Sequence, residues 1–66
     1  MTVGDKIKEL RLSRNIDQKT LAQKLNVQQS AISKWELNKN EPDIKSIIAL
    51  SKFFDVTSDY LLGLED

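Results

Sequence analysis

The sequence predicts an all-α fold. Its single proline, two glycines and few runs of β-branched residues are typical of helices rather than of a sheet. The stretch from Asp17 to Asn38 shows two short helical patterns, separated by a break at residues 26–28. Because each pattern has an apolar side, the two helices should pack against each other, with the rest of the chain around them.

The first helix should run from Val3 to Arg14. Thr2 can cap it, and Asp5 stands three residues further on, as in a capping box. At helical spacing one stripe contains Val3, Ile7, Leu10 and Arg11. Because Arg11 lies on this apolar stripe, a carboxylate partner is expected for it inside the fold.

The second helix should cover Gln18 to Leu25, and the third Gln29 to Leu37. Asp17 is a good N-cap for the second helix, whereas Gln28 is a weaker cap for the third. An asparagine follows each of the first three helices, at Asn15, Asn26 and Asn38. Asparagine tolerates the left-handed conformation that often ends a helix, so positive φ is expected at some or all of these positions.

The fourth helix should run from Ile44 to Phe54, after a polar loop that includes Pro42 and a cap at Asp43. Its buried side is expected to consist of Ile44, Ile47, Ile48, Leu50, Ser51 and Phe54. A short fifth helix should follow a cap at Thr57 or the next residue and end before Gly63. No internal repeat or linker divides the chain, so residues 1–66 are expected to form a single domain.

Composition excludes several classes of site. The chain lacks cysteine and histidine, so disulfides, Cys/His zinc sites and the usual nucleophile–base pairs are excluded, and neither a metal nor a cofactor is expected. Because the carboxylates are also scattered, we expect no enzyme and no small-molecule substrate. The chain has no apolar run of about 18 residues and no signal-peptide core, so a cytoplasmic protein without a membrane partner is expected.

The charges are unevenly distributed along the chain. Residues 1–39 hold eight basic and four acidic side chains, whereas residues 40–66 hold two and six. The two parts therefore carry net charges of +4 and −4. A basic patch on the two-helix unit can attract phosphate, although the acidic part weakens long-range steering. Ordinary surface variation is the other explanation of this asymmetry.

The third helix has two unlike faces at 3.6 residues per turn. Its inward side consists of Ile32, Trp35 and Glu36. Its outward side, near one end, carries Gln29, Ser30, Ser33 and Lys34. Such hydrogen-bonding side chains are those that read base edges in the major groove, which is about 12 Å wide. We interpret the second and third helices as a helix-turn-helix in which residues 29–37 enter the groove.

Gln29 is the best candidate for reading a base, because its carboxamide can pair with N6 and N7 of adenine. Lys34 can donate to O6 or N7 of guanine. The alternative is that these residues only form a polar helix start. Trp35 could stack on a nucleotide, but its position beside Ile32 favours the core. The loop position of Lys39 favours a phosphate contact, whereas solvated side chains are expected for Lys6, Lys19 and Lys24.

Motifs from nearly the whole chain match one family. They are I-K-E-L-R in the first helix, Q-K-T-L-A-Q-K-L-N-V and S-A-I-S-K-W-E in the two-helix unit, and V-T-S-D-Y-L-L-G near the end, with a loop through Pro42. From Val3 to Leu64 the chain resembles the lambda-repressor-like, or Cro/repressor (Xre) type, helix-turn-helix regulators. The agreement extends over all five predicted helices and is therefore more specific than a match of the two-helix unit alone.

The resemblance implies a compact five-helix lambda-repressor-like DNA-binding domain whose helix-turn-helix consists of helices 2 and 3. Such proteins bind double-stranded operator DNA, usually as two-fold dimers, and act as transcriptional repressors or switches in bacteria and phages. By this resemblance the residues that contact bases are Gln29, Ser30 and Lys34. Those that contact phosphate or position the reading helix are Gln18, Gln28, Ser33, Asn38, Lys39 and Asn40. A structural ion pair is implied between Arg11 and Glu36.

Two alternatives stay open. Phe53, Tyr60 and Leu64 could form an apolar patch where two copies meet, with the reading helices about 34 Å apart, or the two rings could complete the core. The function could be sequence-specific DNA binding, or the fold could serve as a protein-interaction module, such as an adaptor or antirepressor. The zero net charge motivates this second function.

Overall fold

The computed structural model describes residues 1–65, so Asp66, the last residue of the predicted domain, lies outside the described residues. Within this range the chain forms the helices α1 (Val3–Ser13), α2 (Gln18–Leu25), α3 (Gln29–Glu36), α4 (Ile44–Phe54) and α5 (Ser58–Leu62). No strand occurs in residues 1–65, which confirms the all-α prediction. α1 and α3 each end one residue before the predicted position, where Arg14 and Leu37 are the C-caps.

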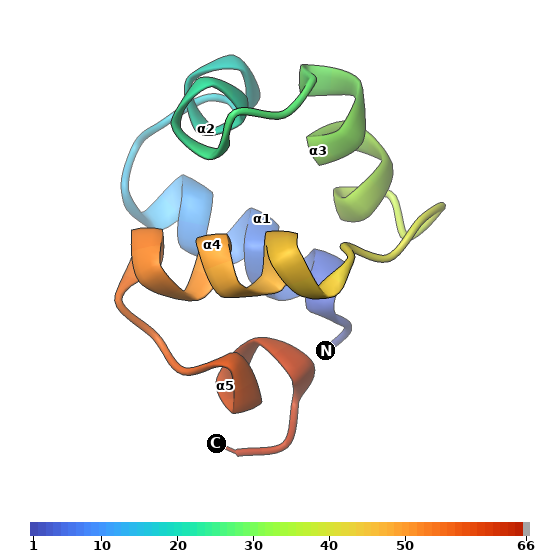
Figure 1. Cartoon of the computed structure of the whole chain (residues 1–66), viewed down its shortest axis with the longest axis vertical. Helices are drawn as coiled ribbons and strands as arrows, with labels where there is room; N and C mark the ends of the chain where they lie inside the picture. The colour runs from blue at the N-terminus through green and yellow to red at the C-terminus, as the bar shows by residue number, and fades with distance from the viewer. Residues whose placement is uncertain (66) are drawn as a thin grey trace.

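In the view of Figure 1, α1 and α4 occupy the middle of the fold. α2 and α3 lie together on one side of this pair, and α5 lies on the other side, near both chain ends (Figure 1). α2 packs on α3 and α4, while α1 packs on α3 and α5. The helix-turn-helix unit therefore packs on α1 through α3 and on α4 through α2.

Local sequence signals determine where the helices begin and end. Thr2 Oγ1 accepts a hydrogen bond from the Asp5 N–H at 3.0 Å, and the Asp5 carboxylate accepts one from the Thr2 N–H at 3.2 Å, so the predicted capping box is present. The carboxylate of Asp17 caps α2 by accepting from the Thr20 N–H, and that of Asp43 caps α4 by accepting from the Ser46 N–H. Positive φ occurs at Asn15, Asn26, Asn38 and Asp55. The prediction of left-handed asparagines is therefore confirmed at all three positions, and Asp55 adopts the same conformation.

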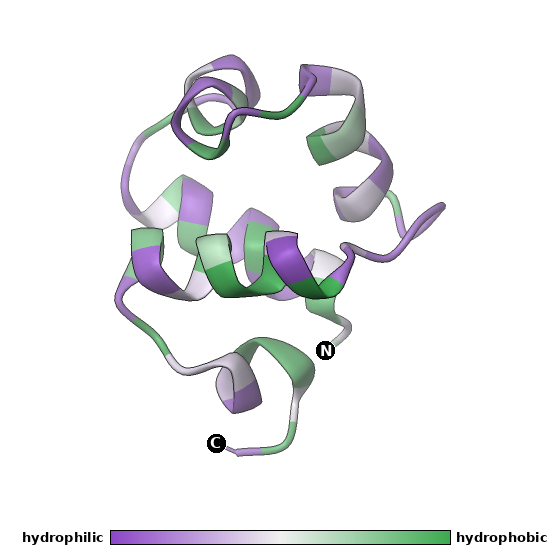
Figure 2. Cartoon of the chain, in the orientation of Figure 1, coloured by the Kyte–Doolittle hydropathy of each residue, from purple (hydrophilic) through white to green (hydrophobic). Residues whose placement is uncertain are grey.

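The core takes apolar side chains from every described helix. Its buried members are Ile7, Leu21, Ala22, Ile32, Trp35, Ile47, Leu50, Phe54 and Leu61. Figure 2 shows α4 as hydrophobic along its middle and the loop before it as hydrophilic. None of the described helices is long and apolar enough to cross a membrane.

The predicted buried side of α4 is too wide. Ile44 is 80% exposed and Ile48 is 46% exposed, whereas Ile47, Leu50 and Phe54 are buried. At about 100° per residue, the buried three form one narrow stripe, and both exposed isoleucines lie roughly 90° or more from its centre. The neighbouring helices cover only this stripe, so the prediction for Ile44 and Ile48 is wrong.

Two cations, Lys6 of α1 and Arg14 just after it, bind the ends of the C-terminal helices. Lys6 Nζ donates to the Tyr60 carbonyl oxygen at 2.8 Å and lies 4.2 Å from the centre of the Tyr60 ring. Arg14 Nη2 donates to the Phe54 carbonyl oxygen at 2.7 Å, at the end of α4. These carbonyls lie in the last turns of their helices, where partners within the helix run out. The expectation that Lys6 is simply solvated is therefore wrong.

Candidate nucleic-acid interface

The turn between α2 and α3 is short and well bonded. Asn26 ends α2 with φ 58°, and the Val27 N–H then donates to the Ala22 carbonyl oxygen at 3.0 Å. Gln28 follows in an extended conformation, and α3 begins at the next residue. Leu21 of α2 and Ile32 of α3 are both fully buried, so the two helices are fixed against the same core.

The outer side of α3 is polar and accessible. Gln29, Ser30 and Lys34 are exposed, as is Gln28 just before the helix, while Ser33 is half-buried. On the opposite side Ile32 is fully buried and Trp35 is only 6% exposed. Because Ser30 and Lys34 are four residues apart, they lie on one face of the helix. The three predicted base-reading side chains are thus presented to solvent from a helix that is anchored along its other side.

An ion pair connects α1 to the end of α3. Arg11 Nε donates to Glu36 Oε2 at 2.7 Å, and Arg11 Nη2 donates to Glu36 Oε1 at 2.9 Å. Arg11 Nη1 donates further to the Ile16 carbonyl oxygen at 3.0 Å, in the turn before α2. Both side chains are nearly buried, with 11% and 4% of their surfaces exposed. The two-pronged geometry satisfies the buried charges and fixes α3 relative to α1.

Both members of the pair remain charged. Burial by itself would raise the pKa of Glu36, but the hydrogen bonds from Arg11 and Gln18, together with the positive charges of Arg11 and Lys8, hold this pKa below its usual value. The hydrogen bond to Glu36 likewise raises the pKa of Arg11. The pair is therefore an ion pair at neutral pH rather than a neutral hydrogen bond.

Gln18 joins the same network from the start of α2. Its Nε2 donates to Glu36 Oε1 at 3.1 Å, which connects α2 to α3 directly. Its side chain is half-buried and directed toward Glu36. Of the two roles expected for Gln18, phosphate contact and positioning of the reading helix, this contact corresponds to positioning.

The loop after α3 continues the exposed polar surface. The backbone N–H groups of Lys39 and Asn40 both donate to the Lys34 carbonyl oxygen, at 2.9 and 3.4 Å. Lys39 and Asn40 have exposed side chains. The side chain of Asn38 is engaged within the protein, because its Oδ1 accepts from Thr2 Oγ1 at 2.8 Å. Sequence reasoning treated Thr2 only as a helix cap and missed this second contact, because it spans 36 residues of chain.

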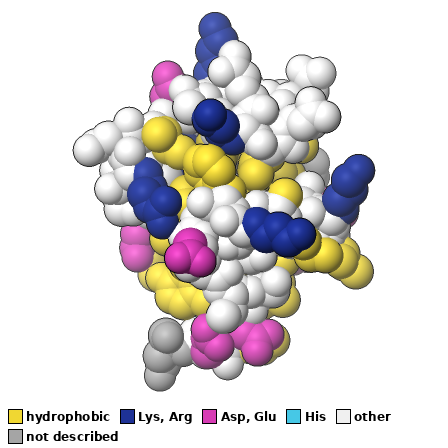
Figure 3. Space-filling model, turned by 60° about the vertical axis from the view of Figure 1, so that its left-hand side comes forward, with side chains coloured by type: hydrophobic (Ala, Val, Ile, Leu, Met, Phe, Trp, Pro, Cys, Tyr) yellow, Lys and Arg dark blue, Asp and Glu magenta, His cyan; other side chains and the backbone are white. Residues whose placement is uncertain are grey.

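Fewer Lys and Arg side chains are available to bind a ligand than the sequence count suggests. In the basic part of the chain, Arg11 is paired with Glu36, and Lys6 and Arg14 bind backbone carbonyls. The remaining cations of that part are exposed: Lys8, Lys19, Lys24, Lys34 and Lys39. Figure 3 shows one face, on which Lys and Arg side chains lie over the upper and middle regions with some acidic side chains among them, and further acidic side chains lie at the lower end. On this face only the lower end carries acidic side chains without basic ones among them.

The predicted dimer residues differ in exposure. Phe53 is half-buried, and its ring meets that of Phe54 edge-on at 5.0 Å. Tyr60 is half-buried under Lys6, whereas Leu64 is 73% exposed. The two rings are thus engaged in packing within the chain, and Leu64 is the member most available to a second copy.

Comparison with known proteins places the chain in a family. A family model described as helix-turn-helix matches residues 7–61. The HTH-type transcriptional activator BcrR of Enterococcus faecalis is 44% identical over 66 residues, which is all of this chain and 32% of that protein. The HTH-type transcriptional regulator ImmR of Bacillus subtilis (strain 168) is 35% identical over 66 residues, which is 52% of its length. The chain thus spans about half or less of these relatives.

A solved structure supports the same assignment. The P22 c2 repressor, in a crystal structure with synthetic operator 9T, superposes with a TM-score of 0.92 and 34% identity, covering 98% of both chains. The repressor protein C2 of Salmonella phage P22 also matches at the sequence level, with 37% identity over 60 residues and 28% of its length covered. The predicted five-helix, lambda-repressor-like fold is therefore confirmed, and the chain belongs to the helix-turn-helix family.

Proposed function

We propose that residues 1–66 act as one DNA-binding domain of a transcriptional regulator, which places α3 in the major groove of an operator. The observation that carries this proposal is the exposed polar side of α3 on a helix whose opposite side is anchored by Ile32, Trp35 and Glu36. The similarity to the P22 c2 repressor, whose structure contains a synthetic operator, supports it. The function is binding and needs no catalytic step, so the chain would not be an enzyme.

Three side chains would read the bases. Gln29 offers an amide donor and acceptor that match adenine, and Lys34 offers a donor for guanine, while Ser30 can serve as either partner. Each well-placed contact of this kind contributes about 1 to 3 kcal/mol of discrimination against a wrong base. All three are exposed, so they can bind bases without breaking interactions inside the protein.

Phosphate contacts would surround this reading surface. The candidates are Gln28 just before α3, Ser33 on α3 between Ser30 and Lys34, and the exposed Lys39 and Asn40 in the loop after it. Each phosphate neutralised lowers log K by about 0.9 per tenfold increase in salt. We assign Gln18 and Asn38 to positioning, because their side chains bind Glu36 and Thr2.

The chain would bind as a two-fold dimer. A single domain of 28 × 23 × 20 Å covers only one half-site, so two copies are needed to place reading helices about 34 Å apart. The proposed contact is Leu64 with the accessible edges of Phe53 and Tyr60. Replacing Leu64 with glutamate should weaken dimerisation in sedimentation experiments and lower operator affinity, while a half-site duplex is bound as before.

Selection of bound sequences from a random duplex pool tests the base-reading assignment. The wild type should select a palindromic consensus. The double variant Gln29→Ala, Lys34→Ala should lose this selectivity, because the donors and acceptors that read bases are gone. The matched control Gln23→Ala, Lys52→Ala removes the same two residue types from exposed positions on α2 and α4 and should keep the consensus. A consensus unchanged in the first double variant would contradict the assignment.

A second candidate function is a protein-interaction module on the same fold. The exposed Ile44 and Ile48 on α4 and the net charge of zero favour it. Salt dependence separates the two functions. Binding to duplex DNA should weaken steeply as salt rises, whereas docking of a protein on the two isoleucines should weaken little or strengthen.

A further inference from the structure

The first turn of α1 is locked against the end of α3. Gly4 is buried there, and a Cβ at this position would lie 2.0 Å from the Trp35 carbonyl oxygen. Only the absence of a side chain permits this approach. The same Trp35 carbonyl oxygen accepts the Asn38 N–H at 3.0 Å. Gly4 therefore packs on the carbonyl that holds the turn at the end of α3.

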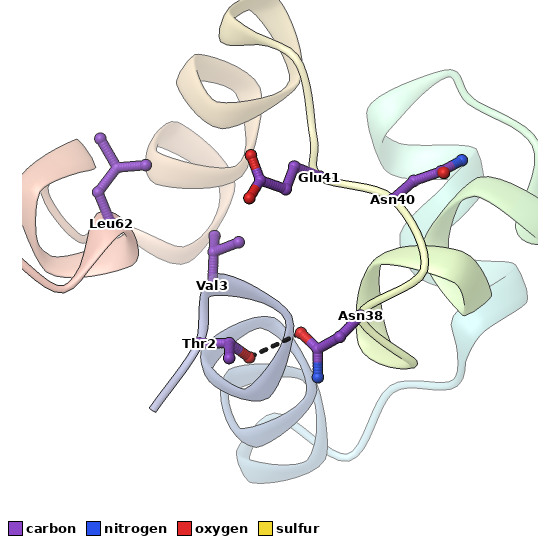
Figure 4. Close-up of a pocket in the computed structure, with 6 residues that line it drawn as sticks. All are labelled: Thr2, Val3, Asn38, Asn40, Glu41 and Leu62. Atoms are coloured by element: carbon purple, nitrogen blue, oxygen red, sulfur yellow. Dashed lines mark hydrogen bonds between the residues drawn. The ribbon is translucent and has the colours of Figure 1, made fainter.

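A side-chain contact reinforces this junction. Thr2 Oγ1 donates to Asn38 Oδ1 at 2.8 Å, a bond marked in Figure 4. One hydroxyl therefore both caps α1 and binds Asn38 in the turn after α3. Asn38 adopts φ 60°, a left-handed conformation that costs non-glycine residues energy unless the surroundings hold it. The carboxylate of Asp5 has a pKa below its usual value, mainly through the Thr2 backbone and with a contribution from the Asn38 side chain.

The conformation of Asn38 determines where the following side chains lie. Lys39 and Asn40 come next, and their N–H groups bind the Lys34 carbonyl, so a change of φ at Asn38 would break both bonds. Figure 4 shows this loop passing the start of α1, with Asn38 directed toward Thr2 and Asn40 directed away from it. The contacts of Thr2 and Gly4 thus act on the loop that carries the proposed phosphate contacts.

We infer that Thr2 and Gly4 are positioning residues for DNA binding, which hold Asn38 in its left-handed conformation so that Lys39 and Asn40 meet phosphates of the duplex read by α3. This inference rests on the proposed function. It assigns to the start of the chain a role in affinity and not in sequence preference, because phosphate contacts carry no direct sequence information. The first turn of α1 touches no DNA in this arrangement and acts through the loop.

The test uses variants of Thr2 and Asn38, with binding measured at a temperature where circular dichroism shows each to be folded. Thr2→Val removes the hydroxyl, and Thr2→Ser keeps it. Asn38→Gly removes the acceptor but still accepts a positive φ. Thr57→Val is the matched control, because Thr57 caps α5 through the same kind of bond to the Tyr60 N–H and lies on another helix. Affinity is measured for operator and for random duplex over a range of salt.

Thr2→Val and Asn38→Gly should each weaken binding to both duplexes by about 3- to 10-fold, the factor that one hydrogen bond supplies. The slope of log K against log salt should become shallower by about 0.9 for each phosphate that the variant no longer neutralises. The operator-to-random ratio should stay unchanged. The double variant should bind no more weakly than either single variant, since both changes remove the same hydrogen bond. Thr2→Ser and Thr57→Val should bind like the wild type.

The inference would be overturned if Thr2→Val and Asn38→Gly both bound DNA with the affinity and the salt slope of the wild type. This result would leave the proposed function intact. An equal loss in Thr57→Val would also overturn it, because general stability would then explain the effect. A wild type that binds no duplex DNA would overturn the proposed function, and the inference with it. Should Thr2→Val fail to fold, Asn38→Gly decides the question alone.

Discussion

The two ends of α3 are built differently. At its start, Gln28, Gln29 and Ser30 are exposed, and Gln28 makes no side-chain capping bond with the described residues. At its end, Glu36 is buried in a network with Arg11 and Gln18, and the following turn is held by α1. One short helix thus has a free end that can meet a ligand and a fixed end that sets its direction.

This difference separates stability from binding. Side chains at the fixed end make contacts that unfolding would break, so their removal should lower the free energy of unfolding. Side chains at the free end contact solvent, and such surface substitutions usually change stability by no more than about 0.5 kcal/mol. Substitutions at the fixed end should therefore destabilise the fold most, and those at the free end should destabilise it least.

Breaking the ion pair should have the largest effect. Arg11→Met would leave the carboxylate of Glu36 buried without its cation, which costs about 3 to 5 kcal/mol of unfolding free energy. Urea denaturation measures this loss. Arg14→Met is the matched control, since Arg14 is exposed and donates to a single carbonyl, and it should lose far less. An Arg11→Met variant as stable as the wild type would show that the pair does not anchor α3.

Adding a side chain at Gly4 should cause the next largest loss of stability. Gly4→Ala should cost about 1 to 3 kcal/mol, because the new Cβ meets the Trp35 carbonyl oxygen at 2.0 Å and backbone must move. At an unobstructed helix position the same change would stabilise by about 1 kcal/mol. Gly63→Ala is the comparison variant for steric overlap. A Cβ there would lie 3.9 Å from its nearest neighbour, so only the positive φ of 78° opposes the change. A more stable Gly4→Ala variant would contradict the close packing.

Acid should remove a smaller part of the stability. The pKa values of Asp5, Asp17, Asp43 and Glu36 lie below their usual values in the folded chain. The folded state therefore binds fewer protons than the unfolded state in this range. The contribution is complete above about pH 5, where unfolded carboxylates are ionised, and is lost as pH falls through the folded pKa values.

Urea midpoints between pH 7 and pH 3 measure this loss. Asp17→Asn keeps an N-cap for α2 but cannot ionise, so its midpoint should fall less steeply with acid than that of the wild type. A midpoint that rises from pH 5 to pH 3 would contradict the assignment of these carboxylates.

The double change on the exposed side of α3 should affect stability least. Gln29→Ala, Lys34→Ala should leave the free energy of unfolding within about 1 kcal/mol, because both side chains are exposed. Calorimetric melting curves of this variant and of Arg11→Met give the contrast directly. A large loss of stability in the double variant would mean that the exposed side of α3 contributes to the fold as much as the buried network around Glu36 does.

Features that depend on neighbours in sequence could be predicted closely. The caps at Thr2, Asp17 and Asp43 and the left-handed asparagines follow from the preferences of single residues. Helical spacing also put Arg11 on the buried side of α1. These signals are local, and they located the helix bounds to within one residue.

Features that depend on distant segments could not be predicted in the same way. The contact between Lys6 and Tyr60 spans 54 residues, and the sequence of neither helix alone predicts it. The exposure of Ile44 depends on how far α2 and α5, the helices that pack on α4, reach over it, not on the residue itself. Gly4 gave a faint signal, because glycine is unfavourable within a helix and needs a reason there.

The most direct test of α3 as the reading helix is nuclear magnetic resonance of the isotope-labelled chain, titrated with the duplex selected from the random pool. The side-chain signals of Gln29, Ser30 and Lys34 should shift most and show contacts to base protons, with smaller backbone shifts at residues 38–40. Shifts confined to α4 and α5, with the signals of α3 unchanged, would contradict the account.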